Sequence, residues 1–405
     1  MTPLDIAIVG YGSGGQAAAL ALSRDGHRVE VFEQAPALRP VGAGFLLQPT
    51  GLSALWELGL LAPALALGRR VDRLYGENDA GRAVMDMAYA GLDPRLFGLG
   101  LQRNALFELL RDAWPGATDV RTATRIVALA PGGRELLDES GARHGPYDLV
   151  IAADGAASKL RGAVGEPRLD RPYPWGALWC LLPEADWPWR NQLRQRYRRA
   201  REMAGMLPVG GRPGDPTPRL SFFWSLPAAA LPEWSREGLA GWKSRVVALW
   251  PALEPMLEPI QAPEQLAHAR YRDAIPGAWS RGRLALLGDA AHAMSPQLGQ
   301  GVNMALLDAL ALRDALRREP DVEAALAAYG ASRRRHVAIY QFWSRWLTPV
   351  FQSDADALAW LRDRAFLPMG RMPGGRGQML RVLTGTQRGW FGRHALPAGF
   401  LAALG

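Results

Sequence analysis

The sequence predicts an α/β fold, in which a parallel sheet flanked by helices is interrupted by an inserted antiparallel sheet and followed by C-terminal helices. Three observations predict this fold. Short apolar runs alternate with alanine-rich helical segments over the first third of the 405 residues, and this alternation returns near residue 284. Between these parts, from about residue 168, short segments are rich in tryptophan, arginine and proline. After about residue 346 the apolar spacing is helical again.

The first element is a βαβ unit. An apolar run over residues 6–9 is followed by Gly10, Gly12 and Gly15, an alanine-rich helix and a second strand, "RVEVFE". In this spacing the first glycine makes a tight turn, the second admits a pyrophosphate close to the backbone, and the third lets helix and strand pack. Glu33 ends the second strand, where its carboxylate can accept hydrogen bonds from both ribose hydroxyls and disfavours a 2′-phosphate. The unit therefore predicts bound FAD or NAD rather than NADP.

Two further segments of the first half point to the same nucleotide. Arg103 precedes an apolar helix, and an arginine at the positive end of a helix dipole indicates an anionic phosphate nearby, with a plain surface arginine as the alternative. Residues 149–153 form a predicted buried strand that ends in Asp154-Gly155. This turn can contact ribose or pyrophosphate through water, or it can be a plain turn.

The middle of the chain predicts an antiparallel sheet. The segments "ALWCLLP", "QRYRRA", "EMAGMLPVGG" and "RLSFFWSLP" alternate with Pro/Gly turns, and nine of the fifteen tryptophans lie between residues 175 and 279. This aromatic sheet forms either a core or the roof of a pocket for a planar apolar substrate. The net charge of +8 raises the question of nucleic acid, but the densest basic run, residues 194–202, is interpreted as a strand with Arg194, Arg196 and Arg198 on a solvated outer face.

A second glycine-spaced loop, "GDAAHAMSPQLGQGVNMA", begins at Gly288 after an apolar strand. Asp289 ends that strand, where it can hold a polyol hydroxyl, and Gly299 and Gly301 let the backbone approach a flat ring. The helix expected from about Val302 directs its N-terminal N–H groups at this ring. A reduced flavin carries negative charge that a helix N-terminus stabilises, whereas NAD needs no such element. The loop therefore favours FAD over NAD.

Together, "GYGSGG" with Glu33, "DGAASKLR" and "GDAAHAMSPQLGQGVNMALLDA" closely resemble the single-component, class A flavoprotein monooxygenases of the p-hydroxybenzoate hydroxylase and salicylate hydroxylase type. The resemblance implies a Rossmann-like FAD-binding domain, discontinuous over residues 1–75, 100–168 and 280–345. It also implies a substrate domain with a mixed or antiparallel sheet over residues 76–99 and 169–279, and a C-terminal helical segment over 346–405. Thr50 departs from the pattern, since many relatives carry asparagine there.

The motifs and the resemblance together give two sets of predicted site residues. The isoalloxazine is expected against the segment from Pro296 to Asn303. The predicted cofactor-binding residues are Gly10, Gly12, Ser13, Gly14, Gly15, Glu33, Gln34, Gly44, Arg103, Val127, Asp154, Gly288, Asp289, Pro296, Gly299, Gln300, Gly301, Val302 and Asn303. The predicted substrate-binding residues are Trp179, Tyr197, Phe223 and Pro296.

The activity implied by the resemblance is that NADH or NADPH reduces FAD, after which O₂ forms a C4a-hydroperoxide. One oxygen atom is then transferred to a small aromatic or similarly activated apolar substrate, in aromatic catabolism or secondary metabolism. The sequence holds no second GxGxxG fingerprint, in agreement with that family. Three alternatives stay open: a flavin-dependent halogenase, a non-oxygenating FAD oxidoreductase and a non-catalytic FAD-binding protein. The halogenase is disfavoured because the only lysines, Lys159 and Lys243, are poorly placed.

No protein acid or base is identified from the sequence. His292 lies in the second glycine loop and is a candidate for an acid/base role near the flavin, but its family counterpart is better interpreted as a packing or hydrogen-bonding residue. Tyr197, His268 and Tyr271 are each interpreted as structural. We expect no metal ion, no nucleic-acid partner and no transmembrane segment, and either a monomer or a homodimer. The single cysteine, Cys180, and an N-terminus without signal-peptide character predict a cytoplasmic location.

Overall fold

The computed structural model describes residues 2–38, 42–372 and 374–405. Among them, a five-stranded sheet carries the nucleotide-binding motifs, in the order β17-β18-β11-β1-β2. β1, β2, β11 and β18 are parallel, with Ile6 paired to both Val29 and Leu149, while β17 is antiparallel at the edge. The strands are β1 (Asp5–Val9), β2 (Arg28–Phe32), β11 (Leu149–Ala152), β17 (Ser280–Arg281) and β18 (Leu284–Leu286).

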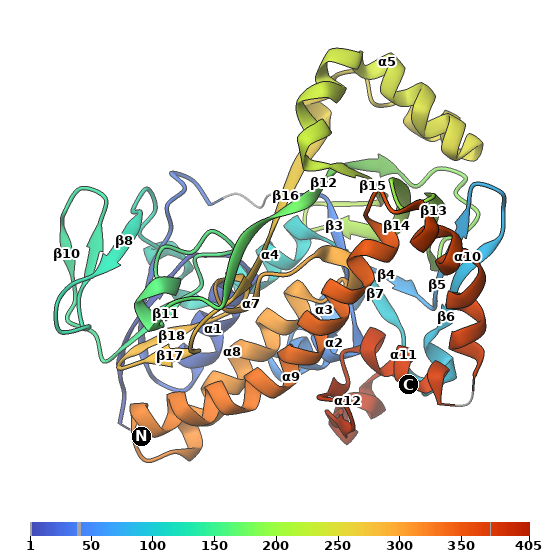
Figure 1. Ribbon diagram of the computed structural model, residues 1–405. Coiled ribbons are helices and arrows are strands. Elements are labelled where there is room, and N and C mark those ends of the chain that lie inside the picture. Colours follow the sequence, from blue (N-terminus) through green and yellow to red (C-terminus); the bar gives the residue numbers. More distant parts are fainter. Residues whose placement is uncertain (1, 39–41, 373) are drawn as a thin grey trace.

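Helices cover this sheet and join strands that are far apart in the sequence. α1 packs against β1 and against α8, and α8 runs beside α9, the long orange helix of Figure 1. Residues of these elements share one large apolar core, in which Ile8, Leu20 and Leu306 are fully buried. The helices of this part are α1 (Ser13–Arg24), α2 (Pro49–Glu57), α3 (Leu61–Leu67), α4 (Arg103–Ala113), α7 (Asp289–His292), α8 (Gly301–Arg318) and α9 (Val322–Phe351).

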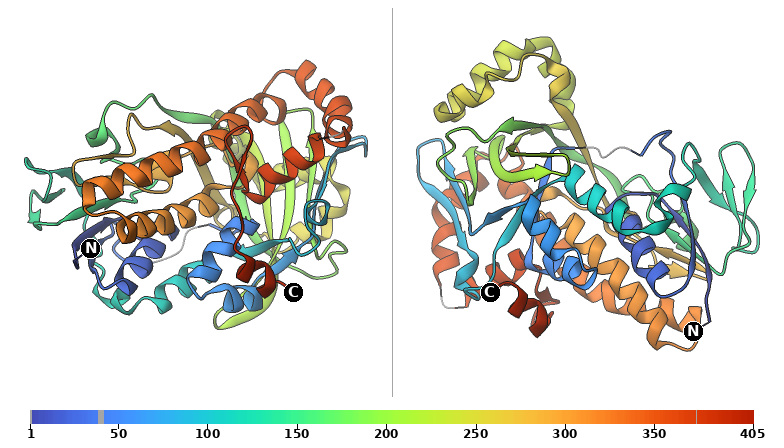
Figure 2. Two further views of the ribbon diagram at one scale, coloured as in Figure 1. Left: turned by 90° about the horizontal axis from the view of Figure 1, so that it is seen from below. Right: turned by 180° about the vertical axis from the view of Figure 1, so that it is seen from behind.

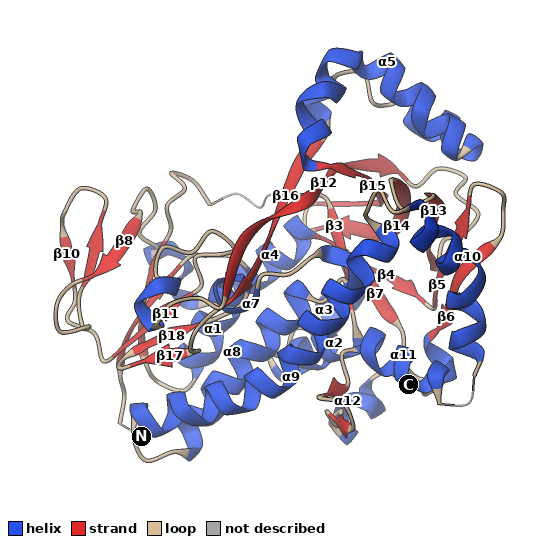
Figure 3. Cartoon of the chain, in the orientation of Figure 1, coloured by secondary structure: helices blue, strands red, loops and turns tan. Residues whose placement is uncertain are grey.

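The tryptophan-rich middle contributes five strands to a seven-stranded sheet in the order β16-β12-β15-β14-β13-β5-β6, and β5 and β6 come from the first quarter of the chain. Its neighbouring strands are antiparallel except for the parallel pair β13 and β5, so the predicted mixed or antiparallel sheet is confirmed. Figure 3 shows the long strands β12 and β16 extending from the nucleotide-binding part up to α5. The elements are β5 (Arg73–Asn78), β6 (Ala83–Ala88), β12 (Leu169–Pro183), β13 (Gln192–Arg198), β14 (Glu202–Arg212), β15 (Asp215–Pro227), β16 (Ala267–Ile275), α5 (Leu231–Leu249) and α6 (Glu254–Leu257).

One face of β13 differs from the prediction. The side chains of Arg194 and Arg196 are only 13% and 19% exposed, and both pair with Glu77 of the neighbouring strand. Arg194 lies 4.4 Å from the ring of Trp189, and Arg196 lies 6.0 Å from that of Trp250. The predicted solvated face is therefore wrong at these two positions, because two tryptophans from neighbouring segments and the parallel strand β5 cover it.

Smaller elements complete the chain. A three-stranded sheet, β3-β7-β4, lies against β14. A second three-stranded sheet, β10-β9-β8, projects from the side of the molecule opposite α10 (Figure 2). Their bounds are β3 (Gly44–Leu47), β4 (Arg69–Val71), β7 (Gly98–Gln102), β8 (Ile126–Leu129), β9 (Leu136–Asp138) and β10 (Arg143–His144). The C-terminal elements are α10 (Asp356–Arg371), α11 (Gly375–Thr384), β19 (Gln387–Arg388), β20 (Gly392–Arg393) and α12 (Ala398–Ala403).

β5 and α9 run across the predicted domain boundaries at residues 75 and 345, and the boundaries themselves stay a prediction. The C-terminal segment is largely helical as expected, with one short hairpin, β19–β20, in addition. None of the helices in the described parts of the chain combines the length and the apolar character that a bilayer span requires.

Candidate FAD site and adjoining cavity

The first glycine loop connects β1 to α1 and has little room for side chains. Gly10 has φ +101°, and a Cβ there would overlap the carbonyl oxygen of Ala153. A Cβ on Gly15 would overlap the carbonyl oxygen of Gly10, so the third glycine of the motif allows the helix to pack on the loop. Gly12 faces open space, as a backbone that receives a phosphate requires. Ser13 and Gly14 open α1, whose N-terminal N–H groups face the same space.

Glu33 follows β2 and is fixed beside this loop. One carboxylate oxygen, Oε2, accepts a hydrogen bond from the backbone N–H of Tyr11 at 2.9 Å, and Oε1 accepts one from Ala35 at 2.9 Å. Each oxygen keeps a further lone pair for a ribose hydroxyl. Gln34, next to it, is exposed.

Asp154 lies beside the first glycine loop with one buried carboxylate oxygen free to accept a hydrogen bond from a ligand. It follows β11, and the Cα of Asp154 lies 3.0 Å from where a Cβ on Gly10 would be. Its Oδ2 accepts a hydrogen bond from the backbone N–H of Lys159 at 2.8 Å, which fixes the turn. Its Oδ1 is buried and has no hydrogen-bond partner among the described residues. Because a buried carboxylate oxygen without a donor is costly, this atom indicates a hydroxyl or water supplied with a ligand.

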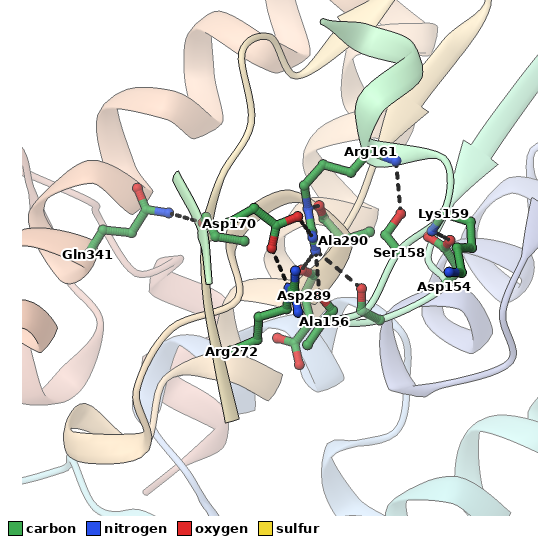
Figure 4. A network of polar contacts seen from close by, with 12 residues as sticks. Asp154, Ala156, Ser158, Lys159, Arg161, Asp170, Arg272, Asp289, Ala290 and Gln341 are labelled. Atoms are coloured by element: carbon green, nitrogen blue, oxygen red, sulfur yellow. Dashed lines mark hydrogen bonds and ion pairs between the residues drawn. The ribbon is translucent and has the colours of Figure 1, made fainter. Parts of the chain in front are cut away.

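Arg161 joins the two halves of the site, as Figure 4 shows. Its guanidinium donates to the carbonyl oxygens of Ala156 at 2.8 Å, Ala290 at 2.8 Å and Asp289 at 3.1 Å, and it pairs with Asp170 at 2.9 Å. The side chain is 2% exposed. In the sequence, Arg161 is the last residue of the motif "DGAASKLR", and a basic residue among small ones after a strand is the only indication of its role. The structure assigns it the role of fixing the Asp154 turn against the second glycine loop.

The strand before the second glycine loop ends earlier than predicted, so Asp289 does not end it. β18 ends at Leu286, and Asp289 opens the short helix α7 with its side chain exposed. Asp289 lines the main cavity, and its Oδ1 lies 3.7 Å from where a Cβ on Gly301 would be. A 3₁₀ turn over Pro296–Leu298 follows, and α8 begins at Gly301, one residue before the predicted start. Pro296 and Gly299 lie on the same cavity wall, together with Val302.

Gln300 and Asn303 have different positions in this loop. Gln300 lines the cavity, and its Nε2 donates to the carbonyl oxygens of Val382 and Leu383, while its Oε1 is buried without a partner in the described structure. Asn303 is fully buried behind the wall, where its Oδ1 accepts from the backbone N–H of Gln48 at 2.8 Å. Asn303 therefore fixes the loop from behind, and direct contact with a cofactor stays a prediction.

His292 lies outside the cavity wall, in a buried ion network. Its Nε2 lies 2.6 Å from Oδ2 of Asp308, whose other oxygen accepts from Nε of Arg333 at 2.6 Å. Asp308 also accepts from the backbone N–H of Gly288 at 2.9 Å. Burial raises the pKa of Asp308, but the neighbouring His292 and Arg333 outweigh it and lower that pKa below its usual value. This arrangement agrees with the interpretation of His292 as a hydrogen-bonding residue.

A cavity of about 1150 Å³ adjoins the second glycine loop. One end is bounded by Asp289, the 296–302 segment and Gly44, and the other by the aromatic sheet and by α10. All four predicted substrate-binding residues, Trp179, Tyr197, Phe223 and Pro296, line it. Its walls are mostly apolar, and Asp289 is the one acidic residue among those that line it in the described structure.

Two of the side chains interpreted as structural also reach this cavity. Tyr271 lies on its wall, where its hydroxyl accepts a hydrogen bond from Nε1 of Trp179 at 3.2 Å. Burial raises the pKa of Tyr271 to about 12, so the hydroxyl keeps its proton at neutral pH. His268 lies on the same strand, β16, and also lines the cavity. The sequence showed no pattern that would place either residue there.

Two predicted cofactor residues lie at the margins of the site. Arg103 opens α4 with an exposed side chain that lines the cavity, and its guanidinium carbon lies 5.6 Å from the ring of Phe45. Val127 lies on β8 of the projecting sheet, with its side chain 37% exposed, and is not among the residues lining the cavity. The roles of both residues toward a cofactor stay predictions.

The sequence also matches a family model described as an FAD binding domain, over residues 3–341. It is 30% identical to 3-hydroxybenzoate 6-hydroxylase 1 of Aquipseudomonas alcaligenes, over 89% of this chain and 92% of that one. The chain belongs to the class A FAD-dependent monooxygenases. The recognition of this family from the sequence motifs is thus confirmed.

Two more comparisons extend this result. A monooxygenase relative from Rhodococcus erythropolis, a probable 2-heptyl-3-hydroxy-4(1H)-quinolone synthase, is 29% identical over 81% of this chain and 84% of its own. The crystal structure of Klebsiella pneumoniae HpxO complexed with FAD and uric acid has a TM-score of 0.78 and 23% identity, and covers 94% of this chain and 97% of that chain. At that identity, the structural match shows a shared fold.

The residues present fit FAD on their own geometry. The unpartnered Oδ1 of Asp154, the open space over Gly12 and the carboxylate of Glu33 lie around the first glycine loop. The exposed Asp289 and the unpartnered Oε1 of Gln300 lie around the second. Arg161 donates hydrogen bonds to carbonyl oxygens of both the Asp154 turn and the second glycine loop, and so connects these two parts of the site.

Proposed function

We propose that this monooxygenase inserts one atom of O₂ into a planar, largely apolar aromatic or heteroaromatic compound, with NADH or NADPH as the electron donor. The observation that carries the proposal is the main cavity, which joins the predicted flavin loop to a wall of aromatic and aliphatic side chains. Bound FAD would supply the oxygen-activating chemistry, which no protein side chain can provide.

The chain's own residues would bind the cofactor, orient the substrate and exclude water. Asp154 and Asp289 would accept hydrogen bonds from the cofactor's hydroxyls, and the N–H groups at the start of α8 would stabilise negative charge on its reduced ring. The apolar walls would keep water from the reacting atoms, which favours oxygen transfer over unproductive loss of peroxide.

The substrate end of the cavity supports a planar ring with an apolar substituent. The rings of Trp179 and Phe223 lie 5.2 Å apart on one wall, where they can cover a flat ligand. Tyr271 donates no hydrogen bond to any described residue, so its O–H group can donate a hydrogen bond to a carbonyl or hydroxyl oxygen of the substrate. Further out, Phe366 and Met369 line the cavity and can contact an aliphatic chain.

This substrate class is tested with compounds taken from the relatives. We expect 2-heptyl-4-quinolone to accelerate NAD(P)H oxidation more than 3-hydroxybenzoate or urate, because only the first has both a flat bicyclic ring and an apolar chain. With ¹⁸O₂, mass spectrometry should find one heavy oxygen atom in the product. Fastest turnover with urate would overturn the substrate class, while a product without heavy oxygen would overturn oxygen insertion.

A matched pair of tyrosine variants tests the binding mode. Tyr271→Phe should raise the KM for the substrate by roughly 5- to 15-fold, since it removes one hydrogen bond of about 1–1.5 kcal/mol. Tyr75→Phe is the control, because Tyr75 lies on β5 and does not line the cavity. Equal KM values for the two variants would contradict a role of Tyr271 in substrate binding.

The alternative functions predict other outcomes in the same assays. A halogenase of this fold would give halogenated product from an indole or phenol with reduced flavin, O₂ and chloride or bromide, but neither Lys159 nor Lys243 lines the cavity. A non-oxygenating oxidoreductase would turn over with no ¹⁸O in the product. A non-catalytic FAD-binding protein would oxidise NAD(P)H at one slow rate whatever compound is added.

A further inference from the structure

A second cavity, of about 430 Å³, lies on α9 beside the loop that follows β16. Arg334, Phe342 and Arg345 of α9 form one side, and residues 275–279 with Arg168 form the other. Gln341, also on this side, donates to the carbonyl oxygen of Ala274 at 3.1 Å and so ties α9 to β16; Figure 4 shows it extending from the helix. Nothing in the assignment of the FAD site or the substrate site uses this cavity.

The charge of the second cavity is positive and partly uncompensated. Arg345 is paired with Asp273, through contacts of 3.0 and 3.2 Å. Arg168 and Arg334 are exposed, and neither side chain has a hydrogen bond or ion pair with any residue in the described parts of the chain. None of the described residues that line the cavity is acidic. Two free guanidinium groups facing one cavity are suited to a phosphate, which they can bind through several N–H groups each.

Three aromatic residues also line the second cavity. Phe342 is 40% exposed and Trp346 is 55% exposed, and both line the cavity together with Trp279. Exposed aromatic rings next to arginines are the surface on which a nucleotide base stacks while its phosphates are bound. Phe342 packs edge-on against Trp390 at 4.9 Å, and Trp346 against Trp343 at 6.0 Å, so these contacts hold the two exposed rings beside the arginines.

The second cavity also adjoins the main one. Arg345 and Trp346 line both cavities, so the main cavity and the second cavity share one wall. A ligand bound by its phosphates at Arg168 and Arg334 would therefore lie beside a wall of the cavity that also adjoins the second glycine loop. The electron donor of this reaction is a dinucleotide with a pyrophosphate, and the only GxGxxG fingerprint of the sequence lies in the FAD site.

We propose that the second cavity binds the phosphate-bearing part of the NAD(P)H donor, with Arg168 and Arg334 on its phosphates and Phe342 or Trp346 against its adenine. The proposal rests on the proposed function, since it assigns a site to the donor of that reaction. It makes Arg168 and Arg334 donor-binding residues, with no role toward FAD or the aromatic substrate.

The test uses the full-length, FAD-loaded protein and the double variant Arg168→Ala/Arg334→Ala. Both side chains are exposed and unpaired, so we expect the variant to fold and to retain FAD. Its KM for NAD(P)H should rise about 10- to 100-fold, which corresponds to about 1.4–2.7 kcal/mol, because charge-assisted hydrogen bonds to the donor's phosphates are lost. The KM for the aromatic substrate and kcat at saturating donor should stay the same. Arg335→Ala is the matched control, because Arg335 is an exposed neighbour on α9 that does not line the cavity.

A binding measurement separates this proposal from the proposed function. ADP-ribose and its 2′-phosphate, titrated calorimetrically into the FAD-loaded protein, should bind to wild type and to Arg335→Ala, and at least tenfold more weakly to the double variant. Binding of both probes unchanged in the double variant would overturn the site even if the enzyme turns over. Binding that is lost in the double variant would support the site even if no tested aromatic compound is oxygenated.

Two other occupants give distinct results. If the cavity binds only a small anionic effector, inorganic phosphate will compete with ADP-ribose but the KM for NAD(P)H will not change in the double variant, which overturns the proposal. If the cavity faces a second copy of the chain, the double variant will change the oligomeric state measured by sedimentation without changing donor binding, and the proposal is again overturned.

Discussion

Replacing Asp308 by asparagine tests whether the buried ion network stabilises the second glycine loop. Asp308 is fully buried and bonds Arg333, His292 and the backbone N–H of Gly288 at 2.6, 2.6 and 2.9 Å. Asparagine keeps the shape but removes the charge, and its amide N–H₂ would face at least one other donor. Arg333, 4% exposed, would then lie buried without a counter-ion. Breaking a buried pair on one side costs about 3–5 kcal/mol, and we expect that loss in the free energy of unfolding.

The assay is urea unfolding followed by tryptophan fluorescence, with FAD affinity measured in parallel. Asp314→Asn on the same helix is the control, since Asp314 is 35% exposed and pairs with Arg313 and Arg318 near the surface. Such a pair contributes about 1 kcal/mol or less. Because Gly288 precedes Asp289, Asp308→Asn should also weaken FAD binding. If it destabilised the protein no more than Asp314→Asn does, the inferred role of the network would be refuted.

Three further predictions follow from the site. Asp289→Ala should weaken FAD about tenfold or more through loss of a charged acceptor, giving nearly colourless protein by its 450 nm absorbance; full colour, as expected for the surface control Asp119→Ala, would contradict the assignment. Gly15→Ala should lower the melting temperature of the FAD-free protein, because its Cβ would overlap a backbone oxygen, whereas Gly12→Ala should weaken FAD binding alone; equal melting temperatures would exclude that packing role. Burial and the charge of Arg333 lower the pKa of His394 to about 4 in the native state. Because the unfolded state then binds a proton more readily than the native state, the free energy of unfolding decreases as pH falls from 6.5 to 4. The loss should be about 3 kcal/mol, and His394→Gln should abolish that part of the pH dependence of the urea midpoint.

The resemblance and the local spacing of residues were sufficient to predict the cofactor and the fold. Gly10, Gly15 and Glu33 lie within one βαβ unit, so the contacts that they make are fixed by a few residues of chain and can be inferred from spacing. The same holds for Asp289 and the 296–302 segment, which form one loop between a strand and a helix. The alternating strands of the middle segment were also predicted, because each needs only its own period-two pattern.

Contacts between distant segments were beyond such inference. Arg161 binds Ala290, 129 residues further along the chain, and Asn303 binds Gln48, 255 residues before it. Arg194 and Arg196 were predicted to be solvated, but Glu77 and two tryptophans cover their side chains. The alternating pattern of a strand does not reveal which other segments will cover one of its faces.

The sequence by itself was sufficient to predict FAD as the cofactor, from the local spacing of its glycine motifs, and the class A monooxygenase family, from the resemblance of those motifs; both predictions are confirmed. Only the tertiary structure decided which side chains meet in the main cavity, Tyr271 among them, and that Arg168 and Arg334 share a second cavity. The physical reason is that the strand order brings residues of separate segments together, and neither composition nor periodicity encodes which segments become neighbours.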